Sequence, residues 1–219
     1  MQRYYGAEKH FDINTFCAYF RKQLIKREPP TLISNDCFAG LIYNASGYKE
    51  YTSISPTINV RIKPDDYLKI VLNPHKYLGI TMEPEGMTLM KGEGYCEVMP
   101  TGRIDDILVC FPHDTKKDVQ KCVDRWNYRK NNIQWNRLGF VVRDFEGFSY
   151  DFIKIMKKSR YPYRINIRTT LSGMNINEKN ILLFTRSFGD YDWPIEEDGF
   201  DFVGWYNDFL DEIEGHSNE

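Results

Sequence analysis

The chain has 219 residues, of which 42% are apolar and 27% are charged, a composition typical of a folded protein rather than a disordered or collagen-like one. Its formal net charge of −2 gives no sign of the basic surface that nucleic-acid-binding proteins use, so we expect no nucleic-acid partner. Its apolar runs, such as residues 107–111, are far shorter than the ~18 residues of a membrane-spanning helix, so we expect no transmembrane segment.

The first half of the chain alternates between helical and strand-like patterns. Apolar residues at helical spacing predict a helix over 11–27, which the Pro29-Pro30 pair ends because neither ring nitrogen can donate a hydrogen bond. A β-prone run at 31–33 then leads through a polar turn into a short helix that begins near Cys37. The next expected elements are a strand over 57–62 and a helix from Pro64 up to Pro74.

The second half contains the clearest strand and a strong helix. Residues 106–111 are an apolar run typical of a buried strand. Residues 116–131 carry an apolar stripe typical of a helix, and Thr115 with Asp118 resembles a capping box at its start. The remaining expected elements are short strands at 87–90 and 95–99, strands at 138–142, 163–167 and 181–184, and helices at 148–158 and 198–213.

Strands alternate with helices through most of the chain. This order predicts an α/β fold with a mostly parallel central sheet, in the three-layer arrangement of Rossmann-like or flavodoxin-like proteins. Residues 79–103 interrupt the alternation with several glycines and prolines, so we expect a small antiparallel insertion there. We expect residues 1–219 to form a single domain, with an N-terminal helical extension over 1–29 and a frayed tail over 214–219.

Polar side chains follow three of the expected strands, at residues 34–37, 113–114 and 143–144. Because ligands of open α/β sheets bind beyond the carboxyl ends of the strands, we expect these segments to converge on one site. Cys37 would lie in the first turn of a helix, where backbone N–H groups and the helix dipole lower the pKa of a thiol and favour a thiolate nucleophile. The alternative is a small buried cysteine of the core.

The turn before Cys37 offers three further polar groups. Ser34 is either a candidate nucleophile or a residue that only hydrogen-bonds within the turn. Asn35 and Asp36 are natural helix-capping residues, and the Asn35 amide is also a candidate donor to an oxyanion. Capping explains one of these residues well without requiring all three together, so both interpretations stay open.

Among the four histidines, His113 is the best candidate for a general base, because it follows the clearest strand and precedes a helix. Asp114 and Asp144 are candidates to orient it in a triad-like arrangement, and each is also a candidate helix cap. Trp126 and Arg129 share a face of the following helix, where Trp126 belongs to the apolar stripe. Arg129 is either a ligand for a phosphate or a sugar acid, or a solvated arginine.

The segment Ile33-Ser34-Asn35-Asp36-Cys37-Phe38-Ala39-Gly40, followed by Tyr43, resembles the opening of a bacterial family, the domain-of-unknown-function family nineteen-nineteen. That family opens on Ile-Ser-Asn-Asn-Cys-Trp-Gly-Gly, so Asp36, Phe38 and Ala39 depart from its pattern. The further matches are Pro64-Asp65-Asp66-Tyr67, His113 before the helix with Trp126 and Arg129, the strand from Leu138 to Asp144, and the closing Trp205-Tyr206-Asn207. The resemblance covers roughly residues 30–210.

The resemblance implies a role in exopolysaccharide or capsule biosynthesis. It carries the family's site residues onto Ser34, Asn35, Cys37, His113, Trp126 and Arg129, with Asp36 and Tyr43 in the same segment. The Asn-Cys turn is also similar to that of capsule acetyltransferases that bind coenzyme A. We therefore expect a transferase that modifies a surface polysaccharide or its sugar precursor by acyl transfer, with a coenzyme A thioester as one candidate donor.

Two other functions fit the same residues. One is a non-catalytic sugar-binding or scaffolding subunit, which the 15% aromatic content would suit. The other is a glycosyltransferase, for which Asp190-Tyr191-Asp192 would be the metal motif, although a loop turn explains that segment as well. The expected partner in each case is a carbohydrate or nucleotide-linked small molecule, and we expect no bound metal.

Five widely spaced cysteines without a CxxC pair, and no apolar leader, predict a cytoplasmic location.

Overall fold

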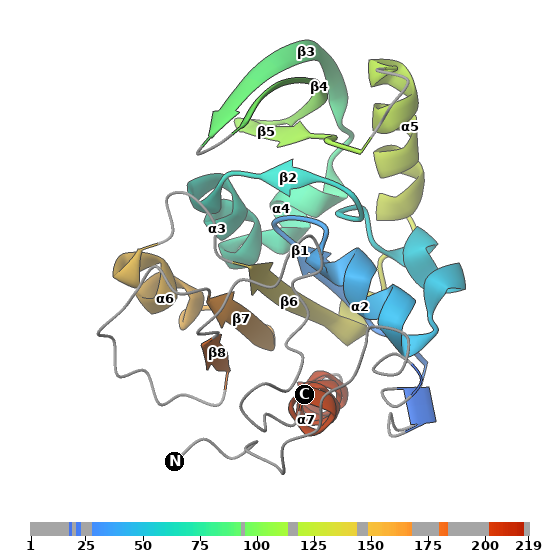
Figure 1. The fold of residues 1–219 in the computed structure, drawn as a ribbon, viewed down its shortest axis with the longest axis vertical. Helices are drawn as coiled ribbons and strands as arrows, with labels where there is room; N and C mark the ends of the chain where they lie inside the picture. Colours follow the sequence, from blue (N-terminus) through green and yellow to red (C-terminus); the bar gives the residue numbers. More distant parts are fainter. Residues whose placement is uncertain are drawn as a thin grey trace.

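The computed structural model of the chain describes residues 18, 21–22, 28–92, 95–113, 118–143, 149–167, 180–183 and 202–216. These residues form a mixed α/β structure that contains two four-stranded sheets (Figure 1). No helix in this described part of the chain combines the length and the apolar character that crossing a bilayer requires. Ala18, Arg21 and Lys22 are helical, as predicted, and the rest of the helix expected over 11–27 lies outside the described residues.

The first sheet is parallel throughout, as the alternation of strands and helices predicts. Its order is β1 (Thr31–Ser34), β6 (Leu138–Arg143), β7 (Tyr163–Ile167) and β8 (Ile181–Leu183). Each neighbouring pair is parallel, with Ser34 opposite Val141 at the carboxyl end of β1. The parallel register brings the carboxyl ends of β1 and β6 to the same edge of the sheet, which is where the candidate site lies.

The second sheet is antiparallel, and it is larger than the insertion expected at 79–103. Its order is β2 (Arg61–Ile62), β5 (Ile107–Cys110), β4 (Tyr95–Ile104) and β3 (Glu83–Gly92). The prediction that the strands at 57–62 and 106–111 belong to the parallel sheet was wrong. The cause is the Asp105-Asp106 turn, where Asp105 adopts a φ of 54° and Ile104 pairs with Ile107. A two-residue turn of this kind joins only antiparallel strands.

Most of the expected helices are present, with altered ends. They are α2 (Phe38–Ser46), α3 (Pro64–Leu72), α5 (Val119–Lys130), α6 (Tyr150–Met156) and α7 (Phe202–His216). A further helix, α4 (Pro74–Gly79), follows α3 directly, because Pro74 begins a new helix as well as ending the old one. Two 3₁₀ helices, η1 (Lys49–Ile54) and η2 (Trp135–Arg137), complete the described elements. The α5 cap is Asp118, whose side chain accepts the Lys121 N–H, and Thr115 lies outside the described residues.

The parallel sheet buries both of its faces, because side chains alternate along each strand. Leu32 and Val141 belong to a cluster shared with α2 and α7. Their neighbours Ile33 and Phe140 belong to a larger cluster shared with α3, α5, α6 and the antiparallel sheet. Figure 1 shows α7 beside the parallel sheet and the antiparallel sheet at the opposite end of the molecule. The mixed α/β class is therefore confirmed, while the three-layer Rossmann-like or flavodoxin-like arrangement stays a prediction.

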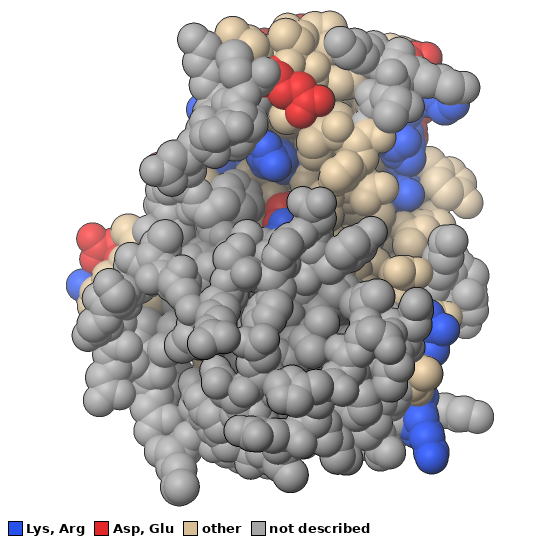
Figure 2. Space-filling view, in the orientation of Figure 1, with Lys and Arg blue, Asp and Glu red and all other residues tan. Residues whose placement is uncertain are grey.

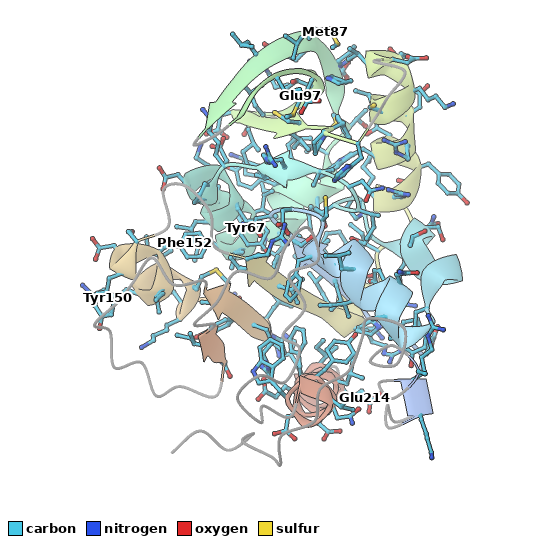
Figure 3. The ribbon with its side chains drawn as sticks, viewed as in Figure 1. Tyr67, Met87, Glu97, Tyr150, Phe152 and Glu214 are labelled. Carbon is cyan, nitrogen blue, oxygen red and sulfur yellow. The ribbon has the colours of Figure 1, made fainter. Side chains whose placement is uncertain are left out.

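Tyr67 ties α3 to the parallel sheet close to the candidate site. Its hydroxyl lies 2.8 Å from the Ile33 carbonyl oxygen and 3.2 Å from the Val141 carbonyl oxygen, so it bridges β1 and β6 (Figure 3). The side chain is fully buried. Because a buried hydroxyl without a partner is costly, this contact fixes how α3 sits against the last residues of the two strands.

Candidate functional site

The turn between β1 and α2 is built from buried polar contacts. Ser34 is fully buried, its hydroxyl donates to the Asp36 carbonyl oxygen at 2.5 Å, and it accepts the Ala39 N–H at 3.4 Å. The Ser34 N–H donates to the Thr57 hydroxyl at 2.9 Å. A hydroxyl that closes a turn and has no accessible surface is not placed to attack a substrate. The structure therefore favours the interpretation in which Ser34 only hydrogen-bonds within the turn.

Asn35 extends the pairing of β1 and β6 with its side chain. Its Oδ1 accepts the Arg143 N–H at 3.0 Å, and its Nδ2 donates to the Arg143 carbonyl oxygen at 2.8 Å. The Asn35 carbonyl oxygen accepts the Ile62 N–H at 2.8 Å, which joins the turn to β2 of the other sheet. The amide that was a candidate oxyanion donor is 1% exposed and engaged with the backbone. Asn35 therefore holds three strands together at the edge of the site.

Asp36 is a buried carboxylate with two partners. Its Oδ2 lies 2.5 Å from both Nε and Nη2 of Arg143, and its Oδ1 accepts the Phe38 N–H at 2.8 Å. It thus accepts the N–H of the first residue of α2 from a place one residue before the N-cap, which is Cys37, and also pairs with an arginine from the end of β6. Asparagine, which the family pattern has at this position, has no charge with which to form this ion pair.

Cys37 and His113 meet at this edge although they are far apart in sequence. Cys37 Sγ lies 2.8 Å from His113 Nε2, within hydrogen-bond distance. Cys37 is half-buried at the start of α2, and His113 is exposed after β5. The predicted convergence of residues 34–37, 113 and 143 is confirmed for these described residues, although His113 arrives from the antiparallel sheet. A thiol beside an imidazole is the arrangement that activates a cysteine nucleophile.

The resting thiol is protonated, contrary to the lowered pKa that the helix start predicted. Burial of the side chain, followed by the negative charge of Asp36, raises the pKa of Cys37 to about 11. The positive charges of Arg143 and Arg61 oppose this shift only in part. The thiol is therefore mostly protonated at neutral pH, and its sulfur lies within hydrogen-bond distance of His113 Nε2.

Arg143 was part of an expected polar strand end but had no predicted role, and Arg61 was not among the candidate side chains; both act on the thiol electrostatically. Arg143 is the last residue of β6, so the strand-end pattern placed it at the site without giving it a role. Arg61 lies in the two-residue strand β2, opposite Cys110 of β5. Its place beside the site depends on pairing within the antiparallel sheet, which the sequence pattern did not predict.

Three other candidate residues have contacts away from the thiol. The Tyr43 hydroxyl donates to the Pro30 carbonyl oxygen at 2.7 Å and accepts the Leu32 N–H at 2.8 Å, so Tyr43 anchors α2 to β1. Trp126 is 1% exposed within the larger core cluster, which agrees with the apolar-stripe interpretation. Arg129 is half-buried, and its Nη1 donates to the Ile58 carbonyl oxygen at 3.3 Å.

The remaining candidates fall outside the described part of the chain. They are Asp114 and Asp144, the expected orienting groups for His113, and the Asp190-Tyr191-Asp192 segment. Among the residues that are described, no three His, Cys, Asp or Glu side chains gather in a way that could hold a metal ion.

Comparison with known proteins identifies the family to which the chain belongs. No curated protein matches the sequence. The family model described as "Domain of unknown function (DUF1919)" matches residues 8–177, a span that includes Cys37, His113, Asp36 and Arg143. This match agrees with the resemblance of the segment around Cys37 and covers most of the chain. The chain therefore belongs to the DUF1919 family.

Proposed function

We propose that the protein is an acyltransferase that uses Cys37 as its nucleophile and His113 as its general base. The observation that carries the proposal is the 2.8 Å contact between Cys37 Sγ and His113 Nε2. Cys37 keeps some exposure, whereas the neighbouring Ser34 hydroxyl is fully buried, so the thiol is the nucleophile of this turn that a substrate can reach. The buried contacts of Asn35 and Asp36 hold the turn rigid, and rigid placement is what positions a reacting atom.

The proposed reaction has two steps. In the first, Cys37 Sγ attacks the carbonyl carbon of the acyl donor while His113 Nε2 takes the thiol proton, and the proton then passes to the leaving group as its bond to the acyl carbon breaks. In the second, an acceptor hydroxyl attacks the thioester while His113 takes the hydroxyl proton. The carbon–sulfur bond breaks, and the sulfur recovers its proton from His113.

The charges around the thiol support acyl chemistry. Each step passes through a tetrahedral intermediate with a negative oxygen, and a fixed positive charge stabilises that oxygen more than it stabilises the neutral carbonyl. Arg61 and Arg143 supply positive charge close enough to Cys37 to affect its pKa. We assign them this stabilising role in place of the Asn35 amide, whose Nδ2 donates to a backbone carbonyl.

We further propose that the acceptor is a surface polysaccharide or its sugar precursor, that the donor is a coenzyme A thioester or another activated acyl group, and that the reaction takes place in the cytoplasm. The support for this context is the exopolysaccharide and capsule association that the family resemblance implies. A hydroxyl acceptor also fits the chemistry, because a sugar presents many hydroxyl groups of suitable reactivity.

The second candidate function is a non-catalytic sugar-binding or scaffolding subunit. The raised pKa of Cys37 favours it, because a thiol with a pKa of about 11 is almost entirely protonated at neutral pH. The close contact with His113 favours the enzyme, since a base can remove that proton during attack.

Substitution of the two residues separates these functions. We expect Cys37→Ala to reduce acetyl transfer from acetyl-coenzyme A to background, and His113→Ala to slow it by about 10²- to 10⁴-fold, the usual contribution of a general base. His75→Ala is the matched control, because His75 is another exposed histidine and hydrogen-bonds with Tyr161 instead. Transfer at the wild-type rate in both Cys37→Ala and His113→Ala, with folding verified by circular dichroism, would refute these two residue roles. No transfer above background by the folded wild type would favour the binding subunit.

A further inference from the structure

The outer edge of the antiparallel sheet is formed by β3, which is the last strand in the sheet order among the described residues. β3 runs for ten residues, Glu83–Gly92, and pairs with β4 on one side. Figure 1 shows it at the rim of the molecule, away from the parallel sheet. The edge of a sheet presents backbone N–H and C=O groups to which a strand of another chain can bind. Proteins therefore either protect such an edge or use it for pairing.

The register shows which residues of β3 have backbone groups that face outward. The Phe111 N–H donates to the Pro100 carbonyl oxygen at 2.9 Å, so the backbone of Pro100 faces β5. Pro100 is opposite Met87 of β3. In an antiparallel ladder the backbone groups of successive residues point to alternate sides, so those of Met87 and Leu89 point away from β4. These two residues therefore present their N–H and C=O groups at the outer edge.

The features that protect an edge strand are confined to the beginning of β3. Pro84 has no N–H, the register with β4 shifts between Pro84 and Gly86, and Gly86 adopts a φ of 123°. Prolines and bulges hinder the pairing of an edge with another strand. After Gly86 the register with β4 is regular up to Gly92. The backbone of residues 87–92 is therefore suited to edge-to-edge pairing.

The same part of the edge carries an exposed apolar surface. Met87, Leu89 and Val98 are 42%, 50% and 42% exposed. Leu89 is opposite Val98 in the ladder, and side chains two residues apart along a strand share a face, so these three side chains form one strip. Figure 3 shows Met87 at the outer rim of the molecule. An apolar strip beside outward-facing backbone groups favours a strand as the molecule that covers it.

The charged side chains described near this strip do not oppose the pairing of two identical surfaces. Glu85, two residues before Met87, accepts hydrogen bonds from Nε and Nη2 of Arg103, each at 2.7 Å, so the two charges compensate each other within one chain. Glu97 is the neighbour of Val98 on β4, so it belongs to the other face of the hairpin. Among the side chains that the structure describes, two copies therefore meet along the strip without placing like charges opposite each other.

We infer that β3 pairs with β3 of a second copy of this chain, antiparallel and around a two-fold axis at Thr88. This register places Met87 of each copy opposite Leu89 of the other, so the outward N–H and C=O groups of the two copies meet. It also brings the exposed apolar side chains of the two copies together. A second copy is the partner because the strip matches itself under the two-fold rotation. The inference is independent of the proposed function, since none of these residues belongs to the site around Cys37.

Sedimentation velocity of the full chain tests the association. Because the paired strip is short, we expect a reversible dimer with a Kd of about 1–100 μM. Leu89→Lys places charges between the two copies and should raise this Kd at least ~tenfold. Val98→Lys is the matched control, because Val98 is similarly exposed but lies in β4, behind the edge, and we expect it to change the Kd by less than about threefold.

Two results would overturn the inference. A wild-type chain that stays monomeric at concentrations well above this range would leave the edge to a strand of a different protein. Equal weakening by Leu89→Lys and Val98→Lys, with both variants folded by circular dichroism, would show that the sheet faces are in contact and not the strand edges.

A disulfide bond tests the register. Thr88 would lie opposite Thr88 of the second copy in a pair without hydrogen bonds, where the two Cα atoms are about 4.5 Å apart. This separation falls within the ~4.4–6.8 Å that a disulfide spans. We expect Thr88→Cys to form a covalent dimer on oxidation with diamide, above the level that the native cysteines give in the wild type. Dimers of Thr88→Cys that form without this disulfide would overturn the proposed pairing.

Discussion

At the scale of single residues, Cys37 combines a half-buried position with a nearby imidazole. A cysteine whose thiolate is stable at rest reacts with any electrophile that reaches it. Cys37 instead has a raised pKa and lies within hydrogen-bond distance of His113, and in the proposed reaction its proton leaves only when a bound substrate accepts the sulfur. Such a thiol resists alkylation and oxidation, which act on thiolates, and under our proposal it attacks only an acyl group that is bound beside it.

The pH dependence of Cys37 alkylation tests this protonation state. With a pKa of about 11 in place of 9.0, about a hundredfold less thiolate is present at neutral pH than for an ordinary thiol. We therefore expect iodoacetamide to label Cys37 slowly near pH 7, and the rate to rise by about tenfold per pH unit until it levels off near the pKa. Peptide mapping by mass spectrometry measures the labelling of Cys37 separately from that of the other cysteines. A fast rate that is flat between pH 6 and pH 8 would instead show a stable thiolate.

The sequence predicted the proximity of Cys37 and His113 better than the electrostatics around them. Cys37 and His113 were selected because each follows a predicted strand and precedes a helix, and both are in the site. The direction of the Cys37 pKa shift was wrong, because the prediction counted the helix start and left out burial and the Asp36 charge. Ser34 and Asn35 carry suitable groups, but whether a polar group faces a substrate or the backbone depends on contacts such as those with Thr57 and Arg143.

At the scale of secondary-structure elements, close packing of α7 on the parallel sheet depends on a glycine of β6. A Cβ atom at Gly139 would lie 2.6 Å from Ile213 Cδ1 and 2.7 Å from Phe209 Cζ, both on α7. Real Cβ atoms essentially never come this close to another atom, so the Ile213 and Phe209 side chains, or the helix that carries them, would have to shift. The absence of a side chain at Gly139 lets α7 approach β6, and this approach supports the strand whose other end holds Arg143.

Replacement of Gly139 tests this packing. We expect Gly139→Ala to lower the free energy of unfolding by about 1–3 kcal/mol, the usual cost of overpacking a core. Gly79→Ala is the control, because a Cβ atom at Gly79 would have no neighbouring atom within 4 Å and its backbone lies in helix α4. That change should leave stability unchanged or raise it by up to about 1 kcal/mol. Urea denaturation followed by tryptophan fluorescence measures both, and equal stabilities for the two variants would contradict the packing argument.

The positions of strands and helices with a clear apolar pattern were predicted well, but the strands with which they pair were predicted less well. The strands β1, β6 and β7 and the helix α5 have apolar patterns that local sequence determines. The pairing of β5 with β2 and β4 depends on the Asp105-Asp106 turn. The apolar run of β5 by itself is equally consistent with a buried parallel strand. An apolar run indicates that a strand is buried, but its direction relative to its neighbours is set by the connections.

At the scale of the whole molecule, the candidate site forms where the two sheets meet. The parallel sheet supplies the turn with Cys37 and the end of β6 with Arg143, and the antiparallel sheet supplies Arg61 and the strand that leads to His113 (Figure 1). The Ile62 N–H bond to the Asn35 carbonyl oxygen joins the two sheets beside the thiol. The contact between Cys37 and His113 therefore exists only when both sheets have formed and are correctly placed against each other.

The most direct test of the account is the covalent state of Cys37 during turnover. The protein is mixed with acetyl-coenzyme A, quenched in acid within seconds, and analysed by intact mass and peptide mapping. We predict one added acetyl group per chain, located on Cys37, that forms more slowly in His113→Ala and is lost when a sugar acceptor is added. Acetyl transfer to an acceptor with Cys37 unmodified at every time point, or an equal rate of acetylation in His113→Ala, would contradict the account.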